Sequence, residues 1–286
     1  MNRELKKVLY YIETHLDDVL DVETLSKVSG YSQYHFCRIF KASVGESLIS
    51  YTSRLRLEKA SLKVIDCDKS IIEIALEAGY ETPNGFNKAF KKIFGQTPTE
   101  YKSRRLKLLQ TYKDKMMQIP KIVQRDKAYV VYVRENGGYE KSCDKAWEKL
   151  SKQLNNLEQK LKDEVANTKI LLDIKNGELL GICHDDPTVT KEENIRYDAA
   201  IAWGKKEVDF LTNQGFDTKE IAGGKHATIL CKGGYKNVFE SWMALYVWCE
   251  QNGHKFRDLS PFEKYLNSPN DVSEEELLTE IYIPIE

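Results

Sequence analysis

Two groups of polar and basic side chains in the first hundred residues have the chemistry needed to contact DNA bases. Arg can form two hydrogen bonds to a guanine edge, Asn can do the same to an adenine edge, and Lys can reach guanine or a phosphate. The first group is Tyr34, Cys37, Arg38 and Lys41, and the second is Asn84, Asn87, Lys88 and Lys91. A single polar face is typical of any solvated amphipathic helix, so its recurrence is what favours DNA binding.

Both groups lie in two copies of one sequence pattern, at residues 19–51 and 70–101. Each copy predicts a short helix, a glycine turn and a second helix capped by Ser32 or Thr82. The polar groups lie opposite the apolar stripe of that second helix. The copies share a Gly-Tyr pair, a Phe, a Gly and a Tyr. Gly30-Tyr31 recurs as Gly79-Tyr80, 49 positions later, and Phe40, Gly45 and Tyr51 recur as Phe90, Gly95 and Tyr101, 50 positions later.

A long helix is predicted between the copies, from Leu48 to Ile65. A rigid helix would fix the distance between the two polar faces. One chain could then enter two successive segments of the major groove, roughly 34 Å apart, without the symmetry of a dimer. We therefore expect a monomer to bind double-stranded DNA.

The charge is divided between the two parts of the chain. Residues 1–110 carry 18 Lys and Arg against 14 Asp and Glu, a net charge of +4, and the remainder carries 25 against 30, or −5, giving the total of −1. A mildly basic first part and an acidic second part indicate separate roles. The length of 286 residues suits two domains.

Several classes of protein are not expected from the composition. No apolar run reaches the ~20 residues needed to span a bilayer, and charges interrupt the N-terminal segment where a secretory signal would lie. We therefore expect a cytoplasmic protein. The six cysteines form no C-x-x-C pair and the five histidines show no ligand spacing, so neither a metal site nor a cofactor is expected.

The second part changes to strand-like periodicity after a linker placed at residues 109–120. Strands are predicted at 128–133, 170–174, 179–183, 199–203, 227–231 and 281–285, with helices at about 140–162 and 235–252. Gly137-Gly138-Tyr139 recurs as Gly233-Gly234-Tyr235, 96 positions later, each before a helix that contains a Trp. The interpretation is an α+β domain, residues 121–286, of two pseudo-symmetric strand-helix-strand repeats with a groove between them.

The first part resembles the AraC/XylS family of transcriptional regulators. The resemblance is carried by G-Y-S-x-x-H-F-x-R-x-F-K from Gly30 to Lys41, I-A-x-x-x-G-Y from Ile74 to Tyr80 and F-K-K-x-F-G-x-T-P-x-x-Y from Phe90 to Tyr101. It implies an all-α domain at 1–108 with two helix-turn-helix units. Tyr34, Cys37 and Arg38 match base-reading positions of the first unit, and Asn84, Asn87 and Lys88 match those of the second. Pro83 and Gly85 depart from the polar residues usual there, which implies looser reading of the second half-site.

The second part resembles the GyrI-like effector-binding domain. The matching elements are His184-Asp185-Asp186-Pro187, Arg196-Tyr197-Asp198, Pro261-Phe262-Glu263-Lys264-Tyr265 and Thr279 to Pro284. Together the two parts resemble the Rob-type regulators. The resemblance implies a pocket in which Glu263 receives a cationic, lipophilic effector, because a carboxylate attracts the charge and aromatic faces attract cations. The predicted walls are Tyr139, Trp203, Tyr235, Trp242 and Tyr265.

Alternatives remain open for the second part. Glu263 could act as the general base of a hydrolase, although no nucleophile motif or phosphate loop accompanies it. The domain could instead bind a protein such as RNA polymerase without any ligand, or could only protect the fold. Core packing is an alternative role for each of the aromatic residues, and a solvated strand position is the alternative for Glu263.

Overall fold

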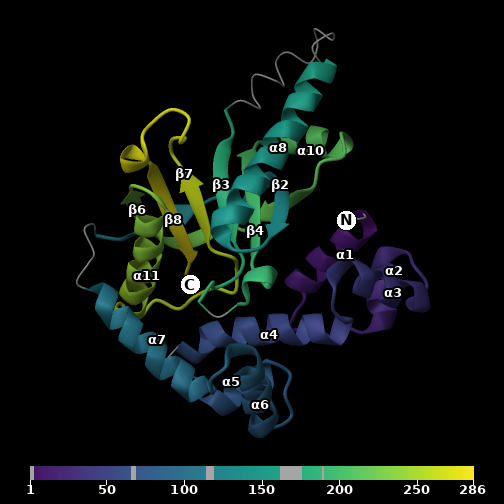
Figure 1. Ribbon diagram of the computed structural model, residues 1–286, viewed down its shortest axis with the longest axis vertical. Helices are drawn as coiled ribbons and strands as arrows, with labels where there is room; N and C mark the ends of the chain where they lie inside the picture. Colours follow the sequence, from purple (N-terminus) through teal and green to yellow (C-terminus); the bar gives the residue numbers. More distant parts are fainter. Residues whose placement is uncertain (1–2, 66–68, 114–118, 162–175, 189) are drawn as a thin grey trace. The chain divides into compact units, whose positions relative to one another are not determined.

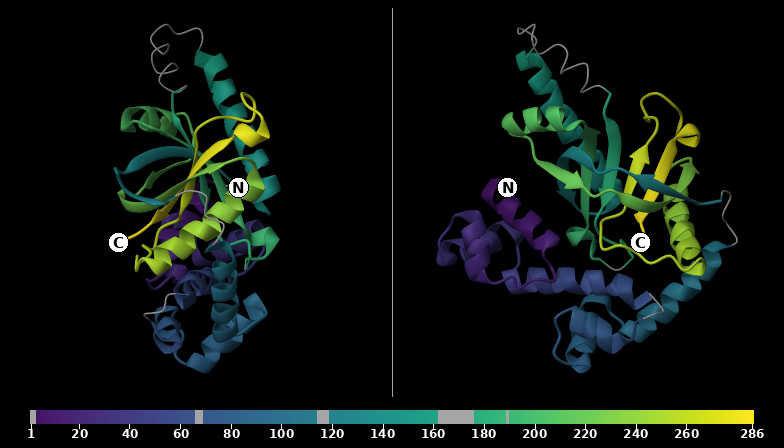
Figure 2. Two further views of the ribbon diagram at one scale, coloured as in Figure 1. Left: turned by 90° about the vertical axis from the view of Figure 1, so that its left-hand side faces the viewer. Right: turned by 180° about the vertical axis from the view of Figure 1, so that it is seen from behind.

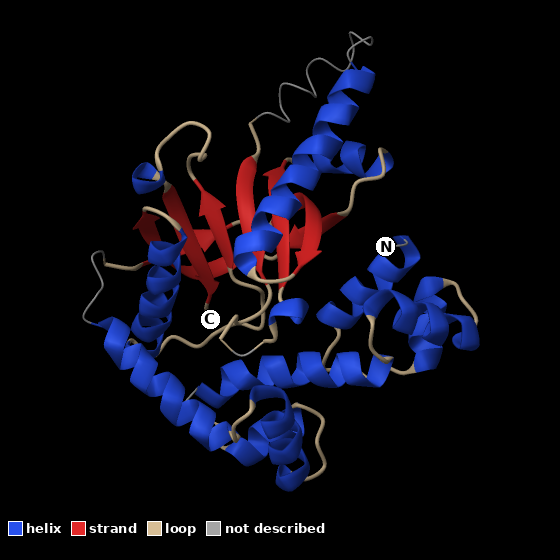
Figure 3. Ribbon diagram, in the orientation of Figure 1, coloured by secondary structure: helices blue, strands red, loops and turns tan. Residues whose placement is uncertain are grey.

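The computed structural model describes residues 3–65, 69–113, 119–161, 176–188 and 190–286. The chain forms two compact units, Met1–Leu106 and Lys107–Glu286, and each is described by itself. Helices make up the first unit, and the second combines strands with helices (Figures 1 and 3). None of the described helices is both long and apolar enough to cross a membrane.

The first unit contains two helix-turn-helix pairs, one on each side of a central helix. The helices are α1 (Arg3–Thr14), α2 (Val22–Ser29), α3 (Gln33–Val44), α4 (Leu48–Ile65), α5 (Ile71–Glu77), α6 (Pro83–Phe94) and α7 (Pro98–Lys113). Helix α4 has the predicted bounds and runs between the pair α2–α3 and the pair α5–α6 (Figures 1 and 2). Helix α7 extends to Lys113, into the segment predicted as the linker.

Local signals in the sequence set the ends of these helices. Ser32 and Thr82 cap α3 and α6 by accepting hydrogen bonds from the backbone N–H groups of His35 and Gly85. Gly30 closes α2 in the left-handed conformation with a φ of 70°, which residues with a side chain rarely adopt. The two pairs therefore have the same turn chemistry at matching positions.

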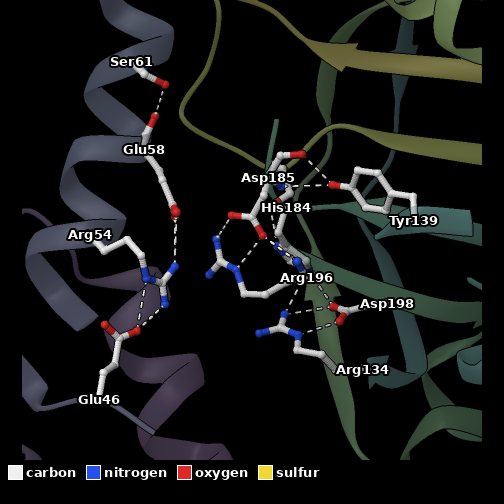
Figure 4. A network of polar contacts seen from close by, with 11 residues as sticks. Glu46, Arg54, Glu58, Ser61, Arg134, Tyr139, His184, Asp185, Arg196 and Asp198 are labelled. Carbon is white, nitrogen blue, oxygen red and sulfur yellow. Dashed lines mark hydrogen bonds and ion pairs between the residues drawn. The ribbon is translucent and has the colours of Figure 1, made fainter. Parts of the chain in front are cut away.

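Basic side chains of α4 hold the surrounding segments in place. Arg54 donates to Glu46 over 2.7 Å and to Glu58 over 3.2 Å (Figure 4), and its side chain is only 11% exposed. Arg56 donates to the carbonyl oxygens of Leu16 and Asp18, in the segment between α1 and α2. These cations therefore contribute to the fold of the unit, because each has a partner within it.

An eight-stranded antiparallel sheet forms the second unit, in the order β1-β6-β8-β7-β3-β4-β2-β5. Helices α8 and α11 cover one face of the sheet (Figure 3), and α10 follows β4. The strands are β1 (Lys121–Arg125), β2 (Ala128–Asn136), β3 (Glu178–Cys183), β4 (Arg196–Trp203), β5 (Thr218–Ile221), β6 (Gly224–Lys232), β7 (Phe262–Tyr265) and β8 (Leu278–Pro284). The helices are α8 (Tyr139–Leu161), α10 (Lys205–Asn213) and α11 (Tyr235–Gln251), with 3-10 turns at Glu192–Asn194 and Glu274–Glu276.

The predicted internal repeat is present. The series β2-α8-β3-β4 corresponds to β6-α11-β7-β8, and the two halves join where β3 pairs with β7. The outer strands are exchanged, because β1 precedes β2 but pairs with β6, while β5 precedes β6 but pairs with β2. The segment between β1 and β2 passes close to the segment between β5 and β6. At Gly223 the approach is so close that a Cβ would meet the backbone of residues 125–127.

Some strand predictions differ from the structure. Strands β1, β5 and β7 were not among the predicted strands; β5 and β7 have four residues each and β1 has five, so alternation gives little signal. The strand predicted at 170–174 lies outside the described residues.

The helix-covered face of the sheet carries two apolar cores, one under α8 with Ala199 and one under α11 with Ile281.

Candidate functional site

The polar face of α3 is exposed along its length. Tyr34, Cys37, Arg38 and Lys41 are all exposed, while Phe36 and Phe40 are fully buried. Arg38 donates to the hydroxyl of Tyr34 over 3.1 Å, and its guanidinium lies 5.5 Å from the centre of the Tyr34 ring. The face therefore presents a guanidinium, a phenol and an ammonium group that can reach a groove of DNA.

Helix α6 presents the corresponding face of the second pair. Asn84, Lys88 and Lys91 are exposed and Asn87 is half-buried, opposite the buried Phe86 and Phe90. Two amides and two ammonium groups can donate to base edges and phosphates. Both predicted groups thus lie on the solvent side of their helices.

On α3, His35 lies between the buried apolar positions and the exposed polar face. Its side chain is exposed, and its ring packs edge-on against Tyr31 with the ring centres 5.2 Å apart. Such a position suits packing against the turn or a contact to a phosphate.

Glu263 is the centre of the candidate site in the second unit. It lies on β7 opposite Gly181 of β3 and Ile281 of β8, and it is only 8% exposed. The indole N–H of Trp242 donates to Glu263 Oε1 over 2.7 Å, and the hydroxyl of Tyr265 donates to Oε2 over 2.6 Å. Among the described residues, no Lys, Arg or His side chain is recorded as pairing with this carboxylate.

The surroundings of Glu263 act on its pKa in opposite directions. Burial raises the pKa of the carboxyl group, and the hydrogen bonds from Trp242 and Tyr265 lower it, with burial the larger effect. When it is ionised, this carboxylate has two neutral donors beside it in an apolar setting. The arrangement can therefore attract a cation more strongly than a solvated carboxylate would.

Hydrogen bonds continue from Glu263 across the sheet to α8. The hydroxyls of Tyr265 and Tyr197 lie 3.0 Å apart, and the indole N–H of Trp147 donates to Tyr197 over 3.0 Å. The thiol of Cys143 donates to the same Tyr197 oxygen over 3.4 Å. The site thus joins β7, β4 and α8 by polar contacts.

Gly181 makes room for the two hydroxyl groups. A Cβ at this position would overlap the hydroxyl oxygens of both Tyr265 and Tyr197. Gly181 is flanked in the sheet by Glu263 on one side and Ala199 on the other. The absence of a side chain at the centre of the sheet therefore allows the two phenols to meet.

The predicted wall residues do not all lie at the same distance from Glu263. Trp242 and Tyr265 contact Glu263 directly. The Tyr139 ring packs edge-on against Tyr197, and its hydroxyl donates to the carbonyl oxygen of Asp185 over 2.6 Å. Tyr139 therefore stays near the site, but its polar group is committed to the backbone of a loop.

Trp203 lies away from this group of residues. The β4 residue level with Gly181 is Ala199, and Trp203 is four residues farther along, roughly 13 Å at the usual rise of a strand. The Trp203 indole lies beside Gly177, where a Cβ would overlap it. The side chain of Tyr235 lies outside the described residues. Trp203 is therefore not among the described contacts of Glu263.

Three residues of the site were not among the predicted ones: Cys143, Trp147 and Tyr197. The internal repeat contained a signal for one of them, because Trp147 and Trp242 occupy equivalent helices and both donate an indole N–H into the site. Cys143 has no comparable signal, and Tyr197 was noticed only as part of a family motif. Burial raises the pKa of the Cys143 thiol to about 11, so this group is a weak nucleophile at neutral pH.

A second polar cluster surrounds Asp198, which is fully buried (Figure 4). Arg134 donates to both of its carboxylate oxygens, over 2.6 and 3.0 Å, and Lys219 also pairs with it. His184 lies 2.7 Å from the same carboxylate. Burial lowers the pKa of His184 to about 4, so this imidazole is neutral at physiological pH. The cluster acts as a buried ion-pair network of the fold.

Comparison with known proteins identifies both units. Residues 118–286 match the family model of the GyrI-like small molecule binding domain, and residues 25–104 match a helix-turn-helix domain. The transposon Tn10 TetD protein of Escherichia coli is 36% identical over 102 residues, which are 36% of this chain and 74% of that protein. The right origin-binding protein of Escherichia coli K12 is 33% identical over 98 residues, which are 34% of each protein.

Several of the longer relatives are thus matched over about a third of their length. Among solved structures, the C-terminal domain of EcmrR is similar at 17% identity with a TM-score of 0.42, over 60% of this chain and 99% of that one.

Proposed function

This chain is a DNA-binding transcriptional regulator of the AraC type and belongs to the GyrI-like small-molecule-binding family, and we propose that its effector is a lipophilic cation that binds at Glu263. The observation that carries the proposal is the buried carboxylate, whose recorded hydrogen-bond partners are the neutral donors Trp242 and Tyr265. A buried charge is costly unless a counter-charge accompanies it, and a lipophilic cation can supply that charge because it gives up little hydration when it leaves water. The aromatic rings add an attraction of ~0.5–2 kcal/mol.

The proposal for the first unit is that α3 and α6 enter successive segments of the major groove. The exposed groups that would read bases are Tyr34, Cys37 and Arg38 on α3 and Asn84, Asn87 and Lys88 on α6, with Lys41 and Lys91 placed toward phosphates. Because both faces belong to one chain and α4 connects the pairs, a monomer is sufficient for binding. RNA polymerase is the protein partner that such a regulator would need at a promoter.

Thermal unfolding with three probes of similar shape tests the ligand class. The probes are methyltriphenylphosphonium as the cation, triphenylphosphine oxide as the neutral compound and tetraphenylborate as the anion. All four tryptophans, residues 147, 203, 242 and 248, lie in the second unit, so tryptophan fluorescence reports that unit. A cation at about 100 times its Kd would stabilise the unit by about 2.7 kcal/mol.

The expected result is a higher midpoint with the cation alone, and loss of this rise in Glu263→Gln. Glu220→Gln, at an exposed residue that pairs with Lys127, is the matched control and should respond as the wild-type protein does. A rise with all three probes, or an equal response in Glu263→Gln, would contradict the proposal.

Two other functions of the second unit give different results in the same assays. A hydrolase would turn over an electrophilic ester or epoxide, and the turnover would vanish in Glu263→Gln. A unit that binds only a protein would show no shift with any probe and would retain RNA polymerase in a pull-down after Glu263→Gln. Neither result would alter the assignment of the first unit to DNA binding.

A further inference from the structure

When Glu263 is ionised, the direction of every hydrogen bond between α8 and its carboxylate follows from counting protons. An indole nitrogen can only donate, and each tyrosine hydroxyl has a single proton to give. Tyr265 gives its proton to Glu263 Oε2, so its oxygen can only accept from Tyr197 across the 3.0 Å between them. Tyr197 therefore gives its proton to Tyr265, and its own oxygen accepts from Trp147 and Cys143.

The chain of donors thus points in one direction, from α8 through β4 and β7 to the carboxylate. Its other end is anchored by Trp242 of α11, which donates to the second carboxylate oxygen. Hydrogen bonds in such a chain polarise one another, so each one strengthens the next.

A neutral carboxyl group would be held less well by the same contacts. Both of its oxygens accept a hydrogen bond, Oε1 from Trp242 and Oε2 from Tyr265. Hydrogen bonds to an ionised acceptor are stronger than those to a neutral one, so both contacts are strongest when Glu263 is charged. The two donors therefore lower the pKa of Glu263 and oppose burial, which raises it.

We propose that Tyr197 is a positioning residue for effector binding: by committing the proton of Tyr265 to Glu263, it orients the carboxylate and favours its charged form for a cation. The proposal rests on the function proposed above for Glu263, and Tyr197 acts through Tyr265 without touching the ligand. Gly181 has a supporting role, because any side chain there would displace both hydroxyls.

Neutral groups surround Glu263 at physiological pH. Burial raises the pKa of each titratable group that faces it, so these phenols and thiols remain protonated there. They are Tyr265 on β7, Tyr197 on β4, Cys143 on α8, Cys183 on β3 and Cys231 on β6. Of these six side chains, Glu263 is therefore the one whose charge changes first as the pH is raised from acid.

Titration of the full chain with methyltriphenylphosphonium between pH 5 and 9 tests the role of Tyr197. In Tyr197→Phe, the pH at which affinity is half its high-pH value should move upward, because the carboxylate has lost support for its charged form. We expect ~2–5-fold weaker binding at the low end of the range and recovery to within about twofold of the wild-type affinity at the high end. Trp147→Phe removes the donor behind Tyr197 and should move the profile in the same direction by less.

The matched control is Tyr129→Phe, which removes a hydroxyl from β2 near Lys127 and Lys205 and should leave the profile unchanged. An unchanged midpoint in Tyr197→Phe, or an equal loss of affinity at every pH, would overturn the proposal.

A ligand-free measurement separates failure of this proposal from failure of the proposed function. If the wild-type protein binds none of the cation, the proposed ligand class is wrong. The carboxyl carbon of Glu263 can then be followed by NMR with labelled glutamate, assigned by comparison with Glu263→Gln. A higher pKa of Glu263 in Tyr197→Phe supports the role of Tyr197, and an unchanged pKa contradicts it.

Discussion

Trp147 and Trp242 donate their indole N–H groups to opposite ends of one hydrogen-bonded group, the first to Tyr197 over 3.0 Å and the second to Glu263 over 2.7 Å. The two residues lie on the equivalent helices of the internal repeat. The carboxylate therefore depends on both halves of the second unit, since one half supplies Glu263 and Trp242 and the other supplies Trp147 and Tyr197. A change in either half should alter the site.

Glu263→Gln should make the stability of the second unit less dependent on pH. Burial raises the pKa of Glu263 above 4.5, so the stability that the neutral carboxyl contributes is present below that pH and is lost as the pH rises through the folded-state value. As the pH rises from 4.5 to the folded-state pKa of Glu263, the variant should gain stability relative to the wild-type protein. Above that pKa the difference in the free energy of unfolding should stay constant. Urea unfolding followed by tryptophan fluorescence measures this difference. A constant difference across the range would contradict the expectation.

Asp198→Asn should strongly destabilise the second unit. Burial alone would raise the pKa of Asp198, but the charges of Arg134 and Lys219 outweigh it and hold the pKa well below its ordinary range. The variant removes the charge that Arg134 and Lys219 both contact, and breaking a buried ion pair in this way costs ~3–5 kcal/mol in the free energy of unfolding. Urea unfolding at pH 7 measures the loss.

The pH dependence of the same ion pair has the opposite sign to that of Glu263. Because the folded-state pKa of Asp198 is depressed, its contribution is present above the unfolded-state pKa and is lost as the pH falls through the folded-state value. The wild-type advantage over Asp198→Asn should therefore shrink in acid. Asp209→Asn, at an exposed pair with Lys205, is the control and should change the stability at pH 7 by less than about 1 kcal/mol, as is usual for exposed pairs.

Arg38→Ala should weaken DNA binding by ~1–3 kcal/mol and relax specificity at one base pair, because a guanidinium reads a guanine edge through two hydrogen bonds. Fluorescence anisotropy on a duplex selected from a random library, with each base pair changed in turn, measures both effects. Lys27→Ala, on α2 and paired with Glu23, is the control and should bind as the wild-type protein does. Equal weakening on every duplex would instead make Arg38 a phosphate contact.

Arg54→Ala should loosen the first helix-turn-helix pair. The substitution leaves Glu46 and the buried Glu58 without the guanidinium that joins them, which costs ~3–5 kcal/mol for a buried pair. The first unit contains no tryptophan, so hydrogen exchange of backbone amides in α3 and α4 is the suitable measurement. Faster exchange in both helices is expected, and faster exchange in α4 alone would show that the ion pairs do not hold α3.

The sequence by itself was enough to place the helix-turn-helix pairs and their polar faces. Helix caps such as Ser32 and Thr82, the turn at Gly30 and the apolar stripe of each second helix are local signals, because they act within one or two turns of a helix. The same local signals put Arg38 and Lys88 on the solvent side. The repeat of Gly-Gly-Tyr likewise indicated the two halves of the second unit before any tertiary contact was known.

Only the tertiary structure decided which residues surround Glu263. Tyr197 and Trp203 lie on the same strand and, six residues apart, on the same face, so alternation cannot choose between them. The register between β4 and β3 makes the choice, since it sets Ala199 level with Gly181 and leaves Trp203 at the far end of the strand. Register depends on pairing between segments that are distant in sequence. Local sequence patterns therefore could not predict the hydrogen bonds that hold Glu263.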